Sequence, residues 1–245
     1  MGTVKVEICC GSAEDVYAAA AAGADRVELN SALSLGGLTP SLGAMALSRR
    51  ADIEIMAMAR PREGGFCYSE MEFETLCADA RALLDAGADG VVFACQHPDG
   101  TVDAQRCRAV LEIIGDRQSV FSRAIDTVPD WRVALDTLCA LGFTRVLTSG
   151  QAPTAPEGAD TIRRMRAYAA GRLEILPGCG VRPENAAELL ARTGCGQLHA
   201  SVKGERPDGS AAHRAAVRFT GAAPGGGCWA VDRSALAALV AAVRN

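Results

Sequence analysis

The sequence is poor in aromatic residues, which make up only 4% of its 245 residues, and it has no excess of basic ones. Its formal net charge is -4 and its isoelectric point is near 5.5. Binding to a phosphate backbone needs a basic face, and binding to single strands also needs aromatic side chains on which bases stack. We therefore expect no nucleic-acid partner.

Long apolar runs are also missing, because none reaches the roughly 20 residues that a membrane-spanning helix needs. The first residues, MGTVKVEICC, pass directly into a strand-like pattern. They lack the basic and then apolar stretch of a signal peptide. We therefore expect no membrane association and a cytoplasmic location.

The ten cysteines contain no C-x-x-C pair, the spacing that is typical of zinc or thioredoxin-like sites. Thiols in a reducing compartment rarely form disulfides, so we expect most of them to be buried as small apolar side chains. Four of them, Cys9, Cys67, Cys95 and Cys179, fall at or just beyond predicted strand ends. Two or three thiolates meeting there would suit a soft ion such as Cu(I), and inert packing is the alternative.

Short apolar, β-branched segments alternate with longer Ala- and Leu-rich segments of helical period, which indicates a parallel sheet covered by helices. Eight such units fit a chain close to the roughly 250 residues of a closed barrel. We predict an α/β fold, a single (β/α)8 TIM barrel over residues 1–245; an open doubly wound sheet would not explain eight regular units. The expected strands are Val4–Cys9, Arg26–Leu29, Ile53–Ala59, Gly90–Ala94, Ser119–Ala124, Arg145–Thr148, Leu173–Leu176 and Gln197–Ala200.

Residues 204–232 break this alternation, with three consecutive glycines, two prolines and no clear periodicity. We expect a long loop after the eighth strand, followed by a last helix from about Arg233. Loops of this length are usually functional or disordered. A lid, a subunit contact and a mobile surface insertion are the three interpretations.

The reactive groups of such a barrel collect at the carboxyl ends of the strands. The first two strands carry Glu7 and Glu28 there. A carboxylate on an apolar strand loses hydration free energy unless it is paired. Two on neighbouring strands therefore indicate acid/base catalysis, a metal, or arginine partners, and a buried ion pair is the structural alternative.

Arginines follow two further strands, Arg60 and Arg62 after the third and Arg123 on the fifth, where Asp126 adds a carboxylate. Guanidinium groups prefer bidentate contacts with anions. We expect Arg60 and Arg62 to lie above the barrel close to the two glutamates, with surface ion pairs as the alternative.

The last three strands offer parts of an anion site, because glycines let backbone amides approach a ligand and barrels often bind phosphate after strands seven and eight. His199, on the eighth strand, is a catalyst or a satisfied core residue. The expected catalytic residues are Glu7, Glu28, Arg60, Arg123, Asp126 and His199. The expected substrate-binding residues are Arg62, Thr148, Ser149, Gly178, Gly180, Ser201 and Lys203.

Several strand-end segments together resemble the CutC family. They are GADRVELNSALSLGGLTPS from Gly23 to Ser41, MARPR from Met58, RAID from Arg123, LTSGQ from Leu147 and the Pro-Gly-x-Gly of the seventh strand. The resemblance covers roughly residues 4–203. It implies a TIM barrel, a cytoplasmic location, homo-oligomers such as a homodimer, copper-ion binding and a role in copper homeostasis.

Three positions depart from the pattern of that family. Asn30 stands where cysteine is usual, Ser122 where histidine is usual, and Cys179 where a third glycine is usual. The first change removes a soft ligand, and Cys179 replaces it only if it faces the same cavity as Cys9. We expect Cu(I), if it binds, at Cys9 and Cys179.

Three hypotheses follow. The first is a copper-binding protein of copper homeostasis. The second is a barrel enzyme that acts on a small phosphorylated or carboxylated metabolite, which the arginines hold. The third is an oligomerising scaffold that uses residues 204–232 as its contact surface.

Overall fold

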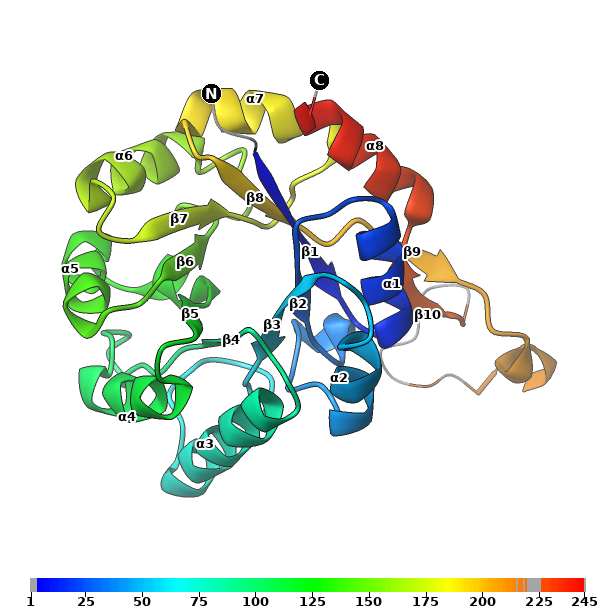
Figure 1. Ribbon diagram of the computed structural model, residues 1–245, viewed down its shortest axis with the longest axis horizontal. Helices are drawn as coiled ribbons and strands as arrows, with labels where there is room; N and C mark the ends of the chain where they lie inside the picture. The colour runs from blue at the N-terminus through cyan, green and yellow to red at the C-terminus, as the bar shows by residue number, and fades with distance from the viewer. Residues whose placement is uncertain (1–3, 215, 218, 220–225, 245) are drawn as a thin grey trace.

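A computed structural model describes residues 4–214, 216, 217, 219 and 226–244. Eight parallel strands surround a common axis, and helices cover the outside (Figure 1). The strands are β1 Lys5–Cys10, β2 Arg26–Leu29, β3 Glu54–Met58, β4 Gly90–Phe93, β5 Gln118–Phe121, β6 Arg145–Thr148, β7 Glu174–Pro177 and β8 Gln197–Ala200. The predicted TIM barrel is confirmed, and the strand bounds differ from those expected by at most three residues.

The hydrogen-bonded ladder runs from β7 through β6, β5, β4, β3, β2 and β1 to β8. Its two end strands lie next to each other, because the side-chain amide of Gln197 on β8 donates to the carbonyl of Ile175 on β7 (3.4 Å). The barrel is therefore nearly closed, and the carboxyl ends of all eight strands face one side of it.

The covering helices are α1 Ala13–Ala21, α2 Leu42–Ser48, α3 Glu70–Asp85, α4 Ala104–Ile114, α5 Trp131–Leu141, α6 Ala159–Ala169, α7 Pro183–Thr193 and α8 Arg233–Arg244. Their ends follow local chemistry: Ser69, for example, caps α3 in a reciprocal capping box with Glu72. Their apolar faces pack on the outside of the sheet and form the main core. Among the described residues, no helix is long and apolar enough to cross a membrane.

The barrel interior is apolar on one side and polar on the other. A second apolar cluster lies on β3 to β7, made of Met56, Met58, Val92, Val120, Leu147 and Leu176. On β1, β2 and β8 the buried residues include Glu7, Glu28 and His199 instead. Burial of charge without a ligand or a partner is unfavourable, so this side must contain a network or a site.

A network is found at the amino ends of the strands. The guanidinium of Arg145 donates to Glu174 (2.9 Å) and Gln118 (2.8 Å), and Arg26 donates to Gln197 (3.0 Å). The side-chain amides of Gln118 and Gln197 extend this network, because they donate to Glu54 (2.5 Å) and Glu174 (3.2 Å) respectively. This ring closes the end of the barrel opposite to the predicted site residues.

The segment after β8 was expected to be a loop throughout, and this is wrong at its two ends. There, β9 Lys203–Arg206 and β10 Cys228–Val231 pair as an antiparallel hairpin. This hairpin lies beside α1 (Figure 1). The first strand has the charged sequence Lys-Gly-Glu-Arg, so it shows no apolar pattern from which a strand could be predicted. Its partner strand lies more than twenty residues away in the sequence. A short 3-10 helix, η3 Gly209–Arg214, follows β9; Gly225, within the glycine run, lies outside the described residues.

Candidate metal centre

Strand register brings four of the predicted site residues together at the polar side of the barrel. Glu7 on β1 is paired in register with His199 on β8, and Cys9 on β1 is paired with Glu28 on β2. Alternate residues of a strand point to the same face, so Glu7 and Cys9 project to one side at successive levels. Glu28 and His199 are buried and Cys9 is half-buried.

Glu7 anchors the lower level of the site. Its Oε2 accepts a hydrogen bond from the buried guanidinium of Arg26, and its Oε1 lies 2.7 Å from Nδ1 of His199. Burial opposes ionisation of Glu7, but Arg26 and His199 outweigh it and lower the pKa of the carboxyl to about 2. Because an ionised carboxylate only accepts, Nδ1 of His199 is the donor, which leaves Nε2 facing the upper level.

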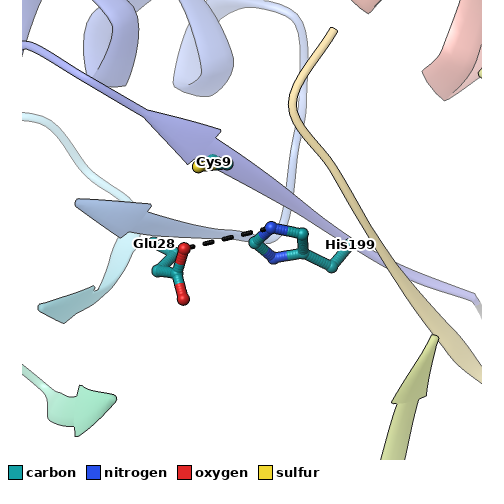
Figure 2. Close-up of side chains that lie close together, drawn as sticks. All are labelled: Cys9, Glu28 and His199. Carbon is teal, nitrogen blue, oxygen red and sulfur yellow. Dashed lines mark ion pairs between the residues drawn. The ribbon is translucent and has the colours of Figure 1, made fainter. Parts of the chain in front are cut away.

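The upper level consists of Cys9, Glu28 and His199, which offer one ligand atom each within 4.8 Å of one another. Figure 2 shows these three side chains converging from β1, β2 and β8. Nε2 of His199 is 3.9 Å from Oε2 of Glu28. A thiol, an imidazole and a carboxylate at this separation form a candidate site for a transition-metal ion.

Asn30 lies beside this group. Its side-chain amide nitrogen donates to Oε2 of Glu28 (2.9 Å) and is 3.5 Å from Sγ of Cys9. The amide fits here because Gly37 leaves room for it: a Cβ at that position would overlap the amide oxygen of Asn30. The side chain at position 30 therefore contacts two of the three candidate ligands.

The site holds its protons tightly when no ion is bound. Burial raises the pKa of Cys9 to about 12, and it also raises the pKa of Glu28, although His199 opposes the shift at Glu28. Burial favours neutral His199, but Cys9, Glu28 and Glu7 together outweigh it and raise the imidazole pKa well above 6.5. An ion that binds here must displace both the thiol proton of Cys9 and the Nε2 proton of the charged imidazole, so binding releases protons and strengthens as pH rises.

The arginines after β3 do not reach this group. Arg60 donates to the carbonyls of Gly37 (3.0 Å) and Gly64 (2.5 Å), and so joins two loops. Arg62 pairs with Glu72 on α3 (2.7 Å). Among the described residues neither arginine pairs with Glu7 or Glu28, and the buried partner of Glu7 is Arg26.

The residues after β5 and β6 form a separate cluster. Asp126 accepts hydrogen bonds from the hydroxyl of Thr148 (2.6 Å), the backbone N–H of Ser149 (3.0 Å) and Nε of Arg123 (2.9 Å). Nη2 of Arg123 donates to the hydroxyl of Ser149 (2.9 Å). The carboxylate thus holds two loops together.

Glycines after β7 pack closely against neighbouring residues. A Cβ at Gly178 would lie 3.2 Å from the Cβ of His199, so this glycine lets β7 approach the imidazole. Gly180 has a positive φ of 71° and faces Thr154. Cys179, between them, donates its thiol to the carbonyl of Pro153 (3.3 Å) and is not part of the group around Cys9.

The last two predicted substrate-binding residues lie towards the hairpin. Ser201 directly follows β8 and is partly exposed. The ammonium of Lys203, on β9, sits over the ring of Trp229 at 5.1 Å from its centroid. All ten cysteines are free; five of them are buried, fewer than expected.

Sequence reasoning missed Arg26 as the partner of Glu7, and it treated Asn30 only as a departure from a pattern. The signal that would have found both is the period of two along β2, because Arg26, Glu28 and Asn30 share one face of that strand. Which residues of neighbouring strands lie side by side then depends on the strand register, which cannot be read from the sequence.

The fold and this group define the chain as a TIM barrel with potential metal ligands at the carboxyl ends of its strands. The model of the CutC family matches residues 4–204, so the chain belongs to the CutC family. A CutC family protein of Treponema denticola is 51% identical over 223 residues, which are 91% of each chain. A human protein named copper homeostasis protein cutC homolog is 40% identical over 205 residues, 83% of this chain and 75% of that one.

Solved structures agree with this placement. A crystal structure of a Streptococcus agalactiae protein assigned as copper homeostasis protein CutC matches with a TM-score of 0.78 and 29% identity. The match covers 81% of this chain and 99% of that one. Phosphoribosyl anthranilate isomerase from Thermotoga maritima matches with a TM-score of 0.59 at 14% identity, a likeness of fold alone.

Proposed function

We propose that the protein binds copper through Cys9 and His199 and that this binding is its part in copper homeostasis. The observation that carries the proposal is the convergence of Cys9, Glu28 and His199 within 4.8 Å. The name of the human relative, copper homeostasis protein cutC homolog, supports the biological role.

The residues fit a copper ion as cargo. A thiolate is the softest ligand that a protein offers, and imidazole also suits copper. Nδ1 of His199 is held by Glu7, which fixes the ring so that Nε2 is the atom available for an ion. Oε1 of Glu28 is buried and has no hydrogen-bond partner in the described part of the chain, so it is free to accept the displaced thiol proton or to ligate.

An enzyme acting on an anionic metabolite has less support. That hypothesis needs guanidinium groups free to hold an anion, whereas Arg60 is engaged by loop carbonyls and Arg62 by Glu72. Arg123 is shared between Asp126 and Ser149.

A competition titration tests the copper site. We expect the reduced protein to take Cu(I) from a chromophoric chelator, and Cys9→Ser to lower the affinity at least about 100-fold, because it removes the only soft sulfur of the group. Cys179→Ser is the matched control: it removes a thiol outside the group and should leave the affinity unchanged. Equal affinities for wild type and Cys9→Ser, or no binding by either, would contradict the proposal.

We also propose a cytoplasmic location and a homo-oligomer such as a homodimer, which the family resemblance supports. Light scattering on the purified protein measures the second directly. A mass equal to that of one 25.4 kDa chain across the working concentration range would contradict the oligomer.

A further inference from the structure

The donor atoms of the candidate metal centre are of three different kinds. Cys9 offers a sulfur, His199 a nitrogen and Glu28 a carboxylate oxygen. No second thiol belongs to the group among the described residues. The thiol of Cys10 donates to the carbonyl of Ile8 (3.6 Å), and that of Cys179 donates to the carbonyl of Pro153. The site therefore contains one soft atom only.

Two buried oxygens at the same place have no hydrogen-bond partner within the described ranges. They are Oε1 of Glu28 and Oδ1 of Asn30, whose side chains are themselves joined by the 2.9 Å hydrogen bond. Glu28 is 4% exposed and Asn30 is 1% exposed. A buried acceptor without a partner is unfavourable, and a cation bound by Glu28 would remove that cost for its carboxylate.

We infer that Asn30 sets the ion selectivity of this group, broadening it beyond Cu(I) to divalent ions that accept mixed sulfur, nitrogen and oxygen ligands, of which Zn²⁺ is representative. Cu(I) is favoured by thiolates and gains little from carboxylate or amide oxygens. Zn²⁺ accepts cysteine, histidine and glutamate together. The inference rests on the proposed function, because it requires that the group binds metal.

The position of Asn30 gives it this influence. Its amide nitrogen is 3.5 Å from Sγ of Cys9, so a thiol at position 30 would stand next to the thiol of Cys9 and supply a second soft ligand. The amide instead donates to Glu28 and orients its carboxylate. Gly37 leaves room for the amide oxygen, which a Cβ at that position would overlap.

The test compares two ions on matched variants. Affinities for Zn²⁺ and, without oxygen, for Cu(I) are measured by chelator competition on wild type, Cys9→Ser, Asn30→Cys and Asn30→Ser. We expect wild type to bind Zn²⁺ and Cys9→Ser to have a lower Zn²⁺ affinity. We expect Asn30→Cys to raise the ratio of Cu(I) to Zn²⁺ affinity at least about tenfold, and Asn30→Ser, which adds no soft ligand, not to raise it.

The outcomes separate the two claims. If wild type binds Cu(I) but no Zn²⁺, or if Asn30→Cys leaves the ratio within about twofold, the selectivity is not set at position 30 and the copper site stands. If neither ion binds, or if Cys9→Ser changes neither affinity, the metal site itself is refuted. If Asn30→Cys fails to fold, the Zn²⁺ affinities of wild type and Cys9→Ser still show whether the group binds a divalent ion.

Discussion

Glu7→Gln will lower the free energy of unfolding at neutral pH by about 3–5 kcal/mol, the range expected when one partner of a buried ion pair is removed. Glu7 is 2% exposed and is the shared acceptor of Arg26 and His199. A neutral amide of the same shape removes the nearest charged partner of the guanidinium, whose other carboxylate neighbour, Glu54, is 3.9 Å away. The loss should be large although no atom of the core packing is deleted.

Urea unfolding of the wild type and the variant measures this loss. The matched control is Glu72→Gln, which removes the same charge from the partly exposed pair with Arg62. That change should cost much less, because water screens a surface pair. Equal losses at the two positions would show that the Arg26–Glu7–His199 chain does not stabilise the barrel as described.

The acid dependence of stability provides a separate test of the same group. The pKa of Glu7 falls from 4.5 to about 2 on folding, so the ionised form stabilises the folded state above pH 4.5 and this contribution disappears as pH falls towards 2. The shift corresponds to about 3 kcal/mol. The difference in unfolding free energy between wild type and Glu7→Gln should therefore shrink when the urea titration is repeated from pH 5 to pH 3. A constant difference would contradict the lowered pKa.

Gly158→Ala will destabilise the protein by about 3 kcal/mol, at the upper end of what overpacking costs. Gly158 precedes α6, and a Cβ there would overlap the backbone carbonyl of Ser149 at the end of β6. Backbone cannot rotate away as a side chain can, so the loop that carries Thr148 and Ser149 would have to move.

The control for this change is Gly196→Ala, since a Cβ at Gly196 meets no atom within 4 Å. We expect its effect to stay within about 1 kcal/mol. Thermal unfolding of the two variants measures the contrast. Similar melting temperatures for both would mean that the contact between α6 and β6 is looser than the structure shows.

The sequence predicted the eight-stranded barrel because its signals are local. Apolar segments such as Arg145–Thr148 and Gln197–Ala200 were located to the residue, since helix and turn patterns bound each of them. The hairpin of β9 and β10 was missed because pairing between Lys203–Arg206 and Cys228–Val231 is not local, and the first strand is charged.

The candidate site was predictable only in part, for a similar reason. Glu7, Glu28, Cys9 and His199 were all identified as strand-end residues, and register places them together. The assignment of partners needed distances: Arg26 rather than Arg60 pairs with Glu7, and Asn30 rather than Cys179 lies beside Cys9. Long polar side chains can reach several partners, so composition at strand ends does not determine which contact forms.

The central claim is that one cysteine and one histidine of this barrel bind copper together. X-ray absorption at the copper edge of the protein loaded with one Cu(I) per chain tests it most directly, because scattering from sulfur and from imidazole nitrogen can be distinguished. We expect one sulfur together with imidazole nitrogen in wild type, and loss of the sulfur signal in Cys9→Ser but not in Cys179→Ser. A spectrum with two sulfurs, or one that Cys9→Ser leaves unchanged, would contradict the account.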